Sequence, residues 1–175
     1  MLIFHYAFSI YYIFECSKLK AMKSLLLLNL LILLGLSAYT QVNIYNPDAD
    51  AKADIANAIS KAKQENKHIF IQIGGNWCPW CVKLHNFLDA DSTLSEILSK
   101  NYVVVKVNYS KENKNLDLLE KLDKPQRFGF PVLVILDSNG KRIHTQDSGL
   151  LESGEGYDRK KVMNFLNNWT PSALK

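Results

Sequence analysis

The stretch GGNWCPWCVKLH, from Gly74 to His85, holds two of the three cysteines of this 175-residue chain and guides the interpretation of the rest. Cys78 and Cys81 are separated by two residues, each follows a tryptophan, and a run of helical character comes next. Side chains at positions i and i+3 of a helix share a face, so the two sulfurs are within reach of a disulfide. The free N–H groups and the dipole at the start of a helix stabilise a thiolate at the first position.

The two cysteines are predicted to differ in their surroundings. Cys78 stands at the start of the helix, where we expect an exposed nucleophile, whereas Cys81 lies one turn inward and is shielded. In thiol–disulfide exchange the first would attack a substrate disulfide, and the second would break the resulting mixed disulfide. Pro79 suits the first turn, because the N–H that proline lacks has no helical partner there.

Other uses of a Cys-x-x-Cys pair agree less well with the sequence. Covalent haem attachment requires His directly after the second cysteine, and Val82 occupies that position. A zinc site of Cys78, Cys81 and His85 remains one ligand short. A disulfide that closes so short a loop constrains the unfolded chain little, which argues against a structural staple. We therefore expect a redox-active disulfide, no metal and no further cofactor.

Helical and strand patterns alternate on both sides of this motif. Upstream, Asn46 is a candidate N-cap with Pro47 at the first helical position, and apolar residues recur at helical spacing as far as Ala62. A buried strand is expected at 68–73. Downstream we expect helices from 78 onward and at 93–100, a strand at 101–109, a helical turn within 111–124, two strands joined by an Asn139–Gly140 turn, and an amphipathic helix within 157–169.

These patterns give the order α-β-α-α-β-(α)-β-β-α for residues 41–175, and no internal repeat or linker divides them. The order predicts an α/β fold in which a central mixed β-sheet is flanked by helices. A segment of this length is large enough to build one hydrophobic core without disulfide staples.

The segments IFIQIGGNWCPWCVKLHNFL (69–88) and FGFPVLVILDSNGK (128–141) resemble the thioredoxin superfamily, in particular exported thiol:disulfide interchange proteins and disulfide isomerases. The resemblance covers about residues 46–169, and it implies a thioredoxin fold for the domain 41–175 and a protein-disulfide oxidoreductase activity. It also implies that Trp77 packs beside the nucleophile. Phe130 and Pro131 would form a cis peptide that faces the dithiol and contacts the substrate.

Three positions bear on how such a site would work. The resemblance implies a buried acidic residue six positions before the first cysteine. Gln72 occupies that position, and its amide cannot act as a base. Lys106 is retained, and either tunes the local field or extends its amine into solvent. Trp80, in the first turn of the helix, is interpreted as a substrate contact in preference to a cap over the helix. We favour a reductase or isomerase over an oxidase; the alternative is a peptide- or client-binding module with little redox turnover.

The first 40 residues differ from the rest in composition. After Met22, one lysine precedes an apolar run from Leu25 to Leu36, and small and polar residues follow, in the order of a secretory signal peptide. Because the run is shorter than the ~20 residues of a membrane span, we prefer a signal peptide cleaved near 38–41 to a membrane anchor. Residues 1–21 are unlike the start of a signal peptide, which suggests that translation begins at Met22. Cys16 would then be absent from the mature chain.

Charge and export define the expected partners. A net charge of +4 without a run of Lys or Arg gives no indication of nucleic-acid binding. An exported, periplasmic protein meets an oxidising environment, in which neighbouring thiols do not stay reduced by default. We therefore expect protein or peptide disulfides and dithiols as substrates, a membrane-linked or periplasmic redox partner, and a monomeric protein.

Overall fold

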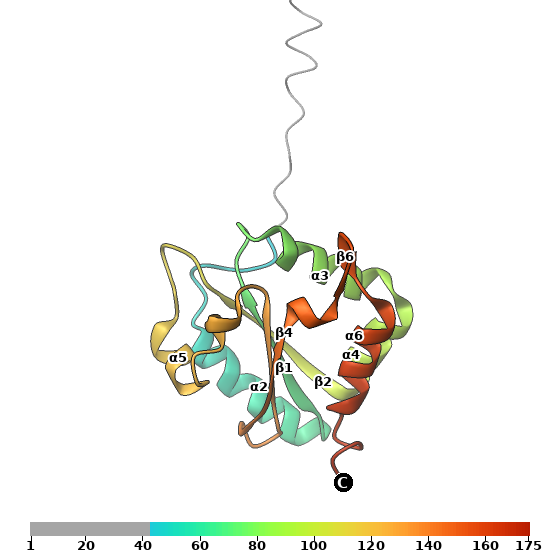
Figure 1. Cartoon of the computed structure of the whole chain (residues 1–175). Coiled ribbons are helices and arrows are strands. Elements are labelled where there is room, and N and C mark those ends of the chain that lie inside the picture. The colour runs from blue at the N-terminus through green and yellow to red at the C-terminus, as the bar shows by residue number, and fades with distance from the viewer. Residues whose placement is uncertain (1–42) are drawn as a thin grey trace, which may run out of the picture. The chain divides into compact units, whose positions relative to one another are not determined.

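A computed structural model describes residues 43–175, in which helices cover both faces of a four-stranded β-sheet (Figure 1). The helices are α2 (Ala51–Glu65), α3 (Pro79–Ala90), α4 (Ser92–Asn101), α5 (Leu116–Lys121) and α6 (Arg159–Asn168). The sheet is built from β1 (His68–Gly74), β2 (Tyr102–Asn108), β3 (Val132–Leu136) and β4 (Arg142–Asp147). This architecture confirms the predicted α/β fold with a central mixed sheet.

The strand order is β2-β1-β3-β4, with β1 and β3 in the middle. β1 runs parallel to β2, from the pair His68 and Tyr102 to the pair Gly74 and Asn108. β3 runs antiparallel to both β1 and β4. The central strand β1 is buried along its whole length, and it delivers the chain directly into the loop that carries the Cys-x-x-Cys motif.

Each face of the sheet has its own hydrophobic cluster, because successive strand side chains point to opposite faces. Ile69, Ile71 and Ile73 of β1 pack with α2 and α5 on one face. Phe70 packs on the other face with α3, α4 and α6, and its ring lies edge-on to Tyr102. α3 is therefore held against the sheet from the face opposite α2, and its N-terminus lies beyond the end of β1.

The turn between β3 and β4 confirms the predicted hairpin. Asp137 Oδ1 accepts hydrogen bonds from the backbone N–H groups of Asn139 at 2.8 Å and Lys141 at 2.9 Å. Gly140 has a φ of +84°, a conformation that glycine adopts without steric cost. The side chain of Asp137 and the glycine together fix the register of the two strands.

The predicted start of α2 is wrong by one turn. Asp50, not Asn46, is the N-cap, and its carboxylate accepts from the N–H groups of Lys52 at 3.0 Å and Ala53 at 3.1 Å. The side chain of Asn46 instead accepts from the N–H of Asp48 at 3.0 Å, which closes a separate local turn. Two residues capable of capping lie close together here, and the one directly before the first buried alanine is used.

Several short elements were not predicted. They are two 3-10 helices, Pro125–Phe128 and Ser148–Leu151, and a small hairpin of β5 (Glu152–Ser153) and β6 (Gly156–Tyr157). Elements of two to four residues show no periodicity in the sequence. The hairpin matters for the site, because β6 brings Tyr157 beside the start of α3.

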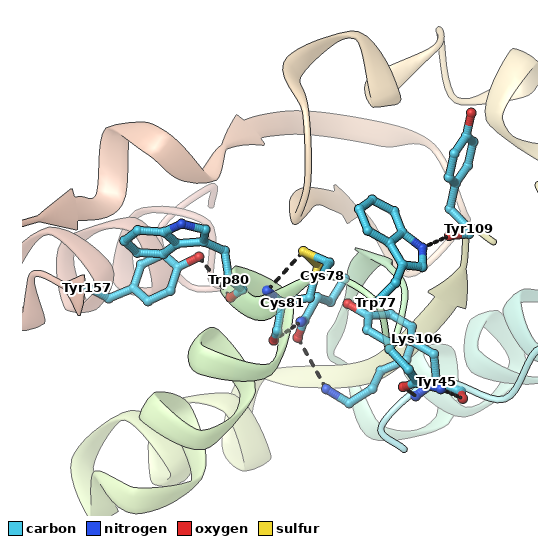
Figure 2. The surroundings of a disulfide bond; sticks show 10 residues. Tyr45, Trp77, Cys78, Trp80, Cys81, Lys106, Tyr109 and Tyr157 are labelled. Carbon is cyan, nitrogen blue, oxygen red and sulfur yellow. Dashed lines mark hydrogen bonds between the residues drawn. A yellow bond between two sulfur atoms is a disulfide. The ribbon is translucent and has the colours of Figure 1, made fainter. Parts of the chain in front are cut away.

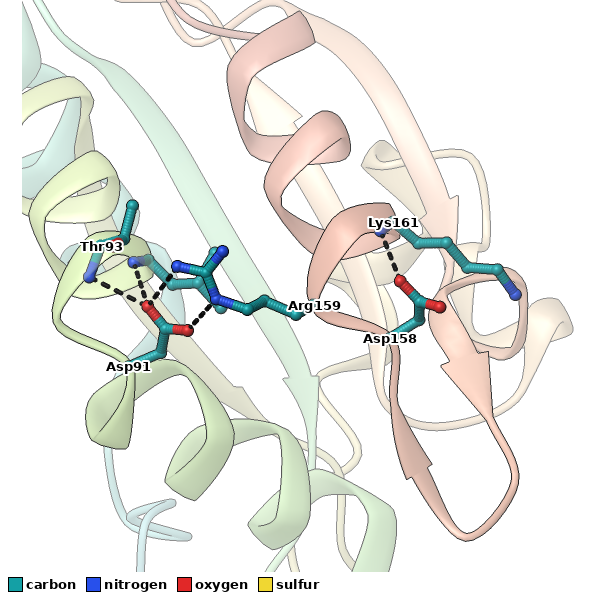
Figure 3. A network of polar contacts seen from close by, with 6 residues as sticks. Asp91, Thr93, Asp158, Arg159 and Lys161 are labelled. Atoms are coloured by element: carbon teal, nitrogen blue, oxygen red, sulfur yellow. Dashed lines mark hydrogen bonds and ion pairs between the residues drawn. The ribbon is translucent and has the colours of Figure 1, made fainter.

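Asp91 connects three helices (Figure 3). It follows the last residue of α3, and it caps α4 by accepting from the N–H groups of Thr93 at 2.9 Å and Leu94 at 3.1 Å. The other carboxylate oxygen accepts from Arg159 Nε at 2.6 Å, in the first turn of α6. Asp158 caps α6 in the same way, accepting from the N–H of Lys161.

The predictions for the N-terminal segment fall outside the described residues. They concern the signal peptide or membrane anchor, the start at Met22, the loss of Cys16 and cleavage near 38–41, and they stay predictions. Among residues 43–175, no helix has both the length and the apolar character that crossing a bilayer requires.

Candidate functional site

Cys78 and Cys81 form a disulfide at the N-terminus of α3 (Figure 2). Their Cα atoms are 5.3 Å apart, and Cys78 is the N-cap residue, with Pro79 at the first helical position. Cys78 Sγ accepts a hydrogen bond from the backbone N–H of Cys81 at 3.1 Å. The sulfur therefore occupies the place where a capping oxygen normally meets the free N–H groups of a helix.

The prediction of an exposed nucleophile is wrong for this disulfide form. Cys78 is 3% exposed and Cys81 is fully buried at 0%. Both sulfurs belong to a small cluster with Tyr45, against which Phe130 and Trp80 also pack. Cys78 keeps a small exposed fraction and Cys81 none, so access favours Cys78 by a small margin.

Trp77 forms the exposed rim beside the disulfide. Its side chain is 55% exposed, and its Nε1 donates a hydrogen bond to the Tyr109 carbonyl at 2.7 Å. Its ring lies edge-on to Phe130, with 5.6 Å between the centroids. The indole is thus fixed in orientation while most of its surface stays open to solvent.

Phe130 and Pro131 stand where the sequence places them. Their peptide bond is cis, and Phe130 packs against the disulfide cluster. The centre of the Phe130 ring also lies 4.6 Å from that of the Tyr109 ring. The structure therefore brings Phe130 to the dithiol, with Pro131 joined to it by the cis bond. Their contact with a substrate stays a prediction.

The sequence interpretation of Trp80 as a substrate contact requires an exposed side chain, but the structure covers part of it. Its ring lies edge-on to Tyr157 at 5.5 Å, and the Tyr157 hydroxyl donates to the Trp80 carbonyl at 3.2 Å. Lys83 Nζ lies 4.3 Å from the centre of the indole ring. The unpredicted β5–β6 hairpin covers this side of the site and leaves Trp80 half-buried.

Gln72 lies behind the disulfide and links α3 to β2. Its Nε2 donates to the Cys81 carbonyl at 3.0 Å, and its Oε1 accepts from Lys106 Nζ at 3.2 Å. Lys106 Nζ also lies 3.4 Å from His85 Nδ1. The amine of Lys106 therefore faces the interior of the site, which agrees with the first of its two interpretations.

Burial lowers the pKa values of the two basic side chains behind Gln72, Lys106 and His85. Desolvation lowers the pKa of Lys106, although the Asp89 carboxylate acts in the opposite direction. Burial also lowers the pKa of His85, and the neighbouring ammonium of Lys106 adds to that effect. Both basic groups are thus more readily deprotonated than in solvent.

Comparison with known proteins agrees with this geometry. The sequence profile of the family described as Thioredoxin-like matches residues 50–138, which is about half of the chain. The chain belongs to the thioredoxin-like family. Its fold is also that of a solved disulphide isomerase from Xylella fastidiosa Temecula1, with a TM-score of 0.65 and 25% identity over 72% of this chain and 95% of that one.

Two curated relatives share shorter stretches with this thioredoxin-like chain. The disulfide bond reductase DsbH of Chlamydia pneumoniae is 28% identical over 96 residues, which cover 50% of this chain and 57% of DsbH. Human spermatogenesis-associated protein 20 is 33% identical over 72 residues, 41% of this chain and 9% of that protein. The chain thus spans little more than half of one relative and a small part of the other.

Tyr45 and Asn76 belong to the thioredoxin-like site but were not predicted. The Asn76 side chain accepts from the Tyr45 N–H at 3.0 Å and donates to the Tyr45 carbonyl at 2.8 Å. This reciprocal pair fastens the segment before α2 to the loop before Cys78. The contact joins residues 31 positions apart, and no local pattern in the sequence signals it.

A hollow of about 560 Å³ adjoins the exposed indole of Trp77. The loop after β2 lines it with Ser110, Lys111 and Lys114, and Asn76 contributes from the loop before Cys78. The hollow therefore extends the exposed surface that Trp77 presents beside the dithiol.

Proposed function

We propose that this chain is a thiol:disulfide oxidoreductase that acts on protein or peptide disulfides through Cys78 and Cys81, with no cofactor besides this pair. The observation that carries the proposal is the hydrogen bond from the Cys81 N–H to Cys78 Sγ at the helix start. A charged sulfur accepts a hydrogen bond more strongly than a neutral one, so this position favours the Cys78 thiolate. Membership of the thioredoxin-like family supports the same chemistry.

In the reductive direction the reaction has two steps. The Cys78 thiolate attacks one sulfur of a substrate disulfide, a mixed disulfide forms, and the other substrate sulfur leaves as a thiolate that takes up a proton. Cys81 then loses its proton and attacks Cys78 Sγ. The bond between Cys78 and the substrate breaks, the second substrate thiolate leaves with the proton, and the Cys78–Cys81 disulfide is restored. The substrate disulfide is reduced and the enzyme dithiol is oxidised.

The substrate would lie across Trp77, Phe130 and Pro131. Phe130 packs against the disulfide cluster and against Trp77, and the indole of Trp77 is exposed yet held by Tyr109. A rigid aromatic surface loses little conformational entropy when a partner packs against it. We assign Trp80 a smaller share of the contact, because Tyr157 and Lys83 already cover much of it.

We infer that the protein is exported to the periplasm and works there as a monomeric reductase or isomerase. The apolar run from Leu25 to Leu36 supports export. The names of the similar proteins, a disulfide bond reductase and a disulphide isomerase, support this direction. Its dithiol would be regenerated by a membrane-linked or periplasmic electron donor.

Mixed-disulfide trapping tests the proposal. The purified full chain should reduce the interchain disulfides of insulin with dithiothreitol as electron donor, and Cys78→Ser should abolish the activity. Cys81→Ser should accumulate a covalent complex that a reducing agent releases, because no resolving thiol remains. Cys16→Ser is the matched control and should behave as the parent chain. Wild-type rates in Cys78→Ser would overturn the proposal.

A second candidate function is a peptide- or client-binding module with little turnover. Gln72 favours it, because a side chain without an acidic group cannot accept the proton of the resolving thiol. A pure binder would leave Cys81→Ser without covalent partners. The reduction potential adds a second criterion: a value near −270 mV is typical of a reductase, and one near −120 mV of an oxidase.

A further inference from the structure

The hydroxyl group of Tyr45 is buried beside the disulfide with no hydrogen-bond partner among residues 43–175. Tyr45 is 2% exposed and packs in one cluster with both cysteines. A buried hydroxyl normally finds a partner, because leaving it unpaired costs the free energy of removing it from water. An unpaired hydroxyl at a reactive site therefore suggests a partner that forms in another state of the site.

The partner is identified by what the hydroxyl faces. A Cβ added to Gly74 would collide with both Cys81 Sγ and the Tyr45 hydroxyl, which lies 2.8 Å from the Cβ position. The sulfur and the oxygen are thus neighbours across the space that the missing side chain leaves open. Figure 2 shows the ring of Tyr45 directed from its own segment toward the disulfide.

We propose that the Tyr45 hydroxyl donates a hydrogen bond to the Cys81 sulfur when that sulfur is a thiolate. In the disulfide the sulfur is a weak acceptor, and the hydroxyl has no strong partner. In the reduced chain and in the mixed disulfide, Cys81 is free to lose its proton, and the resulting thiolate offers a strong acceptor. Tyr45 is a positioning residue that stabilises the resolving thiolate, at a site whose internal acid is replaced by Gln72. The proposal rests on the proposed function.

The phenol keeps its proton in this role. Burial raises the pKa of Tyr45 well above its usual value, although the neighbouring Gln72 side chain acts in the opposite direction. Gln72 already donates to the Cys81 carbonyl and accepts from Lys106. A hydrogen bond from the second amide hydrogen of Gln72 to Tyr45 would use the phenolic oxygen as acceptor. The phenolic O–H would still be available as a donor. The proton that Cys81 loses is taken up by the departing substrate thiolate.

Other titratable groups approach the dithiol from different elements. Lys106 of β2 and His85 of α3 lie behind Gln72. Tyr157 of β6 donates its hydroxyl to the Trp80 carbonyl and is already paired. Among these groups, Tyr45 is the one that shares the open space beside Cys81 Sγ.

The test uses Cys16→Ser as the parent chain, which leaves Cys78 and Cys81 as the thiols. It follows the two thiol releases that occur when the reduced chain reacts with dithiobis(nitrobenzoate). The first release reports attack by Cys78, and the second reports resolution by Cys81. In Tyr45→Phe the second release should slow about tenfold near neutral pH, and its pH midpoint should rise by about one unit, because a hydrogen bond to a charged group is lost. The first release should be unchanged.

Tyr102→Phe is the matched control. It also removes a buried hydroxyl, which donates to the Leu166 carbonyl, but it lies in the cluster around Phe70 and should leave both releases unchanged. An unchanged pH midpoint of the second release in Tyr45→Phe, or equal changes in both releases, would overturn the proposal. A missing first release in the parent chain would instead contradict the proposed function.

A measurement on the unsubstituted chain covers the case in which Tyr45→Phe does not fold. With ¹³C at the tyrosine Cζ positions, the Tyr45 resonance of the reduced chain should shift as the pH is raised and Cys81 becomes a thiolate, and the Tyr102 resonance should not. An unmoved Tyr45 resonance contradicts the proposal without any variant.

Discussion

At the scale of single residues, the side chain that reaches the Cys81 carbonyl is an amide and not a carboxylate. Gln72 occupies the position of the expected acid and uses its amide for two hydrogen bonds, to the Cys81 carbonyl and from Lys106. A neutral amide avoids the cost of burying a charge next to an apolar strand. The arrangement stabilises the start of α3 but has no group of its own to accept the Cys81 proton.

We expect Gln72→Glu to accelerate the resolution step at neutral pH severalfold, because a carboxylate beside Cys81 can act as a general base. Lys106 would pair with the new carboxylate and keep it charged. The change should appear in the second thiol release of the assay above and not in the first. Gln72→Leu, which removes the amide without adding a charge, is the control and should not accelerate either release. Equal rates in Gln72→Glu and the parent chain would contradict a proton-transfer limit.

At the scale of secondary-structure elements, the dithiol is positioned by the packing of α3 between the sheet and the β5–β6 hairpin. Leu84 and Leu88 hold α3 in the cluster around Phe70, and Tyr157 holds its first turn from outside. Asp91 fixes the other end of the helix by capping α4 and binding Arg159. Contacts at both ends of α3 therefore keep Cys78 at a defined point beyond β1.

Asp91 allows a test of this connection. Asp91→Ala should lower Tm by about 4 °C at neutral pH, because the cap of α4 is lost. Asp91→Asn keeps an oxygen for the cap and loses only the ion pair, so its Tm should fall by less. Thermal unfolding followed by circular dichroism measures both. Equal losses in the two variants would show that the cap contributes nothing.

The pH dependence of the ion pair has a definite sign. Hydrogen bonding from the Arg159 guanidinium, followed by that from the Leu94 N–H, holds the pKa of Asp91 below its usual value. A lowered pKa in the folded state contributes stability above the unfolded pKa of about 3.9, and that contribution is lost as the pH falls through the folded value. The Tm difference between the parent chain and Asp91→Asn should therefore be constant above about pH 5 and disappear in acid. A difference that persists below the folded value would contradict this origin.

At the scale of the whole molecule, periodic patterns in the sequence predicted the fold. The features that they did not predict depend on contacts between residues far apart in the sequence. The strand 68–73, the Asn139–Gly140 turn and the helix start at Cys78 are local features, and all three are confirmed. Tyr45 reaches the dithiol through a contact across 31 positions, and Trp80 is covered by a two-residue strand from near the C-terminus. The sequence therefore identified the disulfide pair, whereas the contacts of Tyr45 and the β5–β6 hairpin with its surroundings had no local signal.

The reductive direction predicts a difference in the stability of the whole fold. The folded and unfolded chains, each in its oxidised and reduced form, make up a closed thermodynamic cycle. If folding makes the dithiol a stronger reductant, the folded chain must therefore have a larger free energy of unfolding with the disulfide than with two thiols. We expect the oxidised chain to unfold at a higher guanidinium concentration than the reduced chain, with about 1.4 kcal/mol for each 30 mV by which folding lowers the potential. Tyr45→Phe should widen the gap at alkaline pH, where Cys81 of the reduced chain is a thiolate, because it removes a hydrogen bond that the oxidised chain does not make. Denaturation of Cys78→Ser in oxidising and reducing buffer is the control and should give equal midpoints.

A reduced chain that is more stable than the oxidised one would assign the protein to the oxidases, because a stabilised reduced form drives the dithiol to take electrons from its substrates.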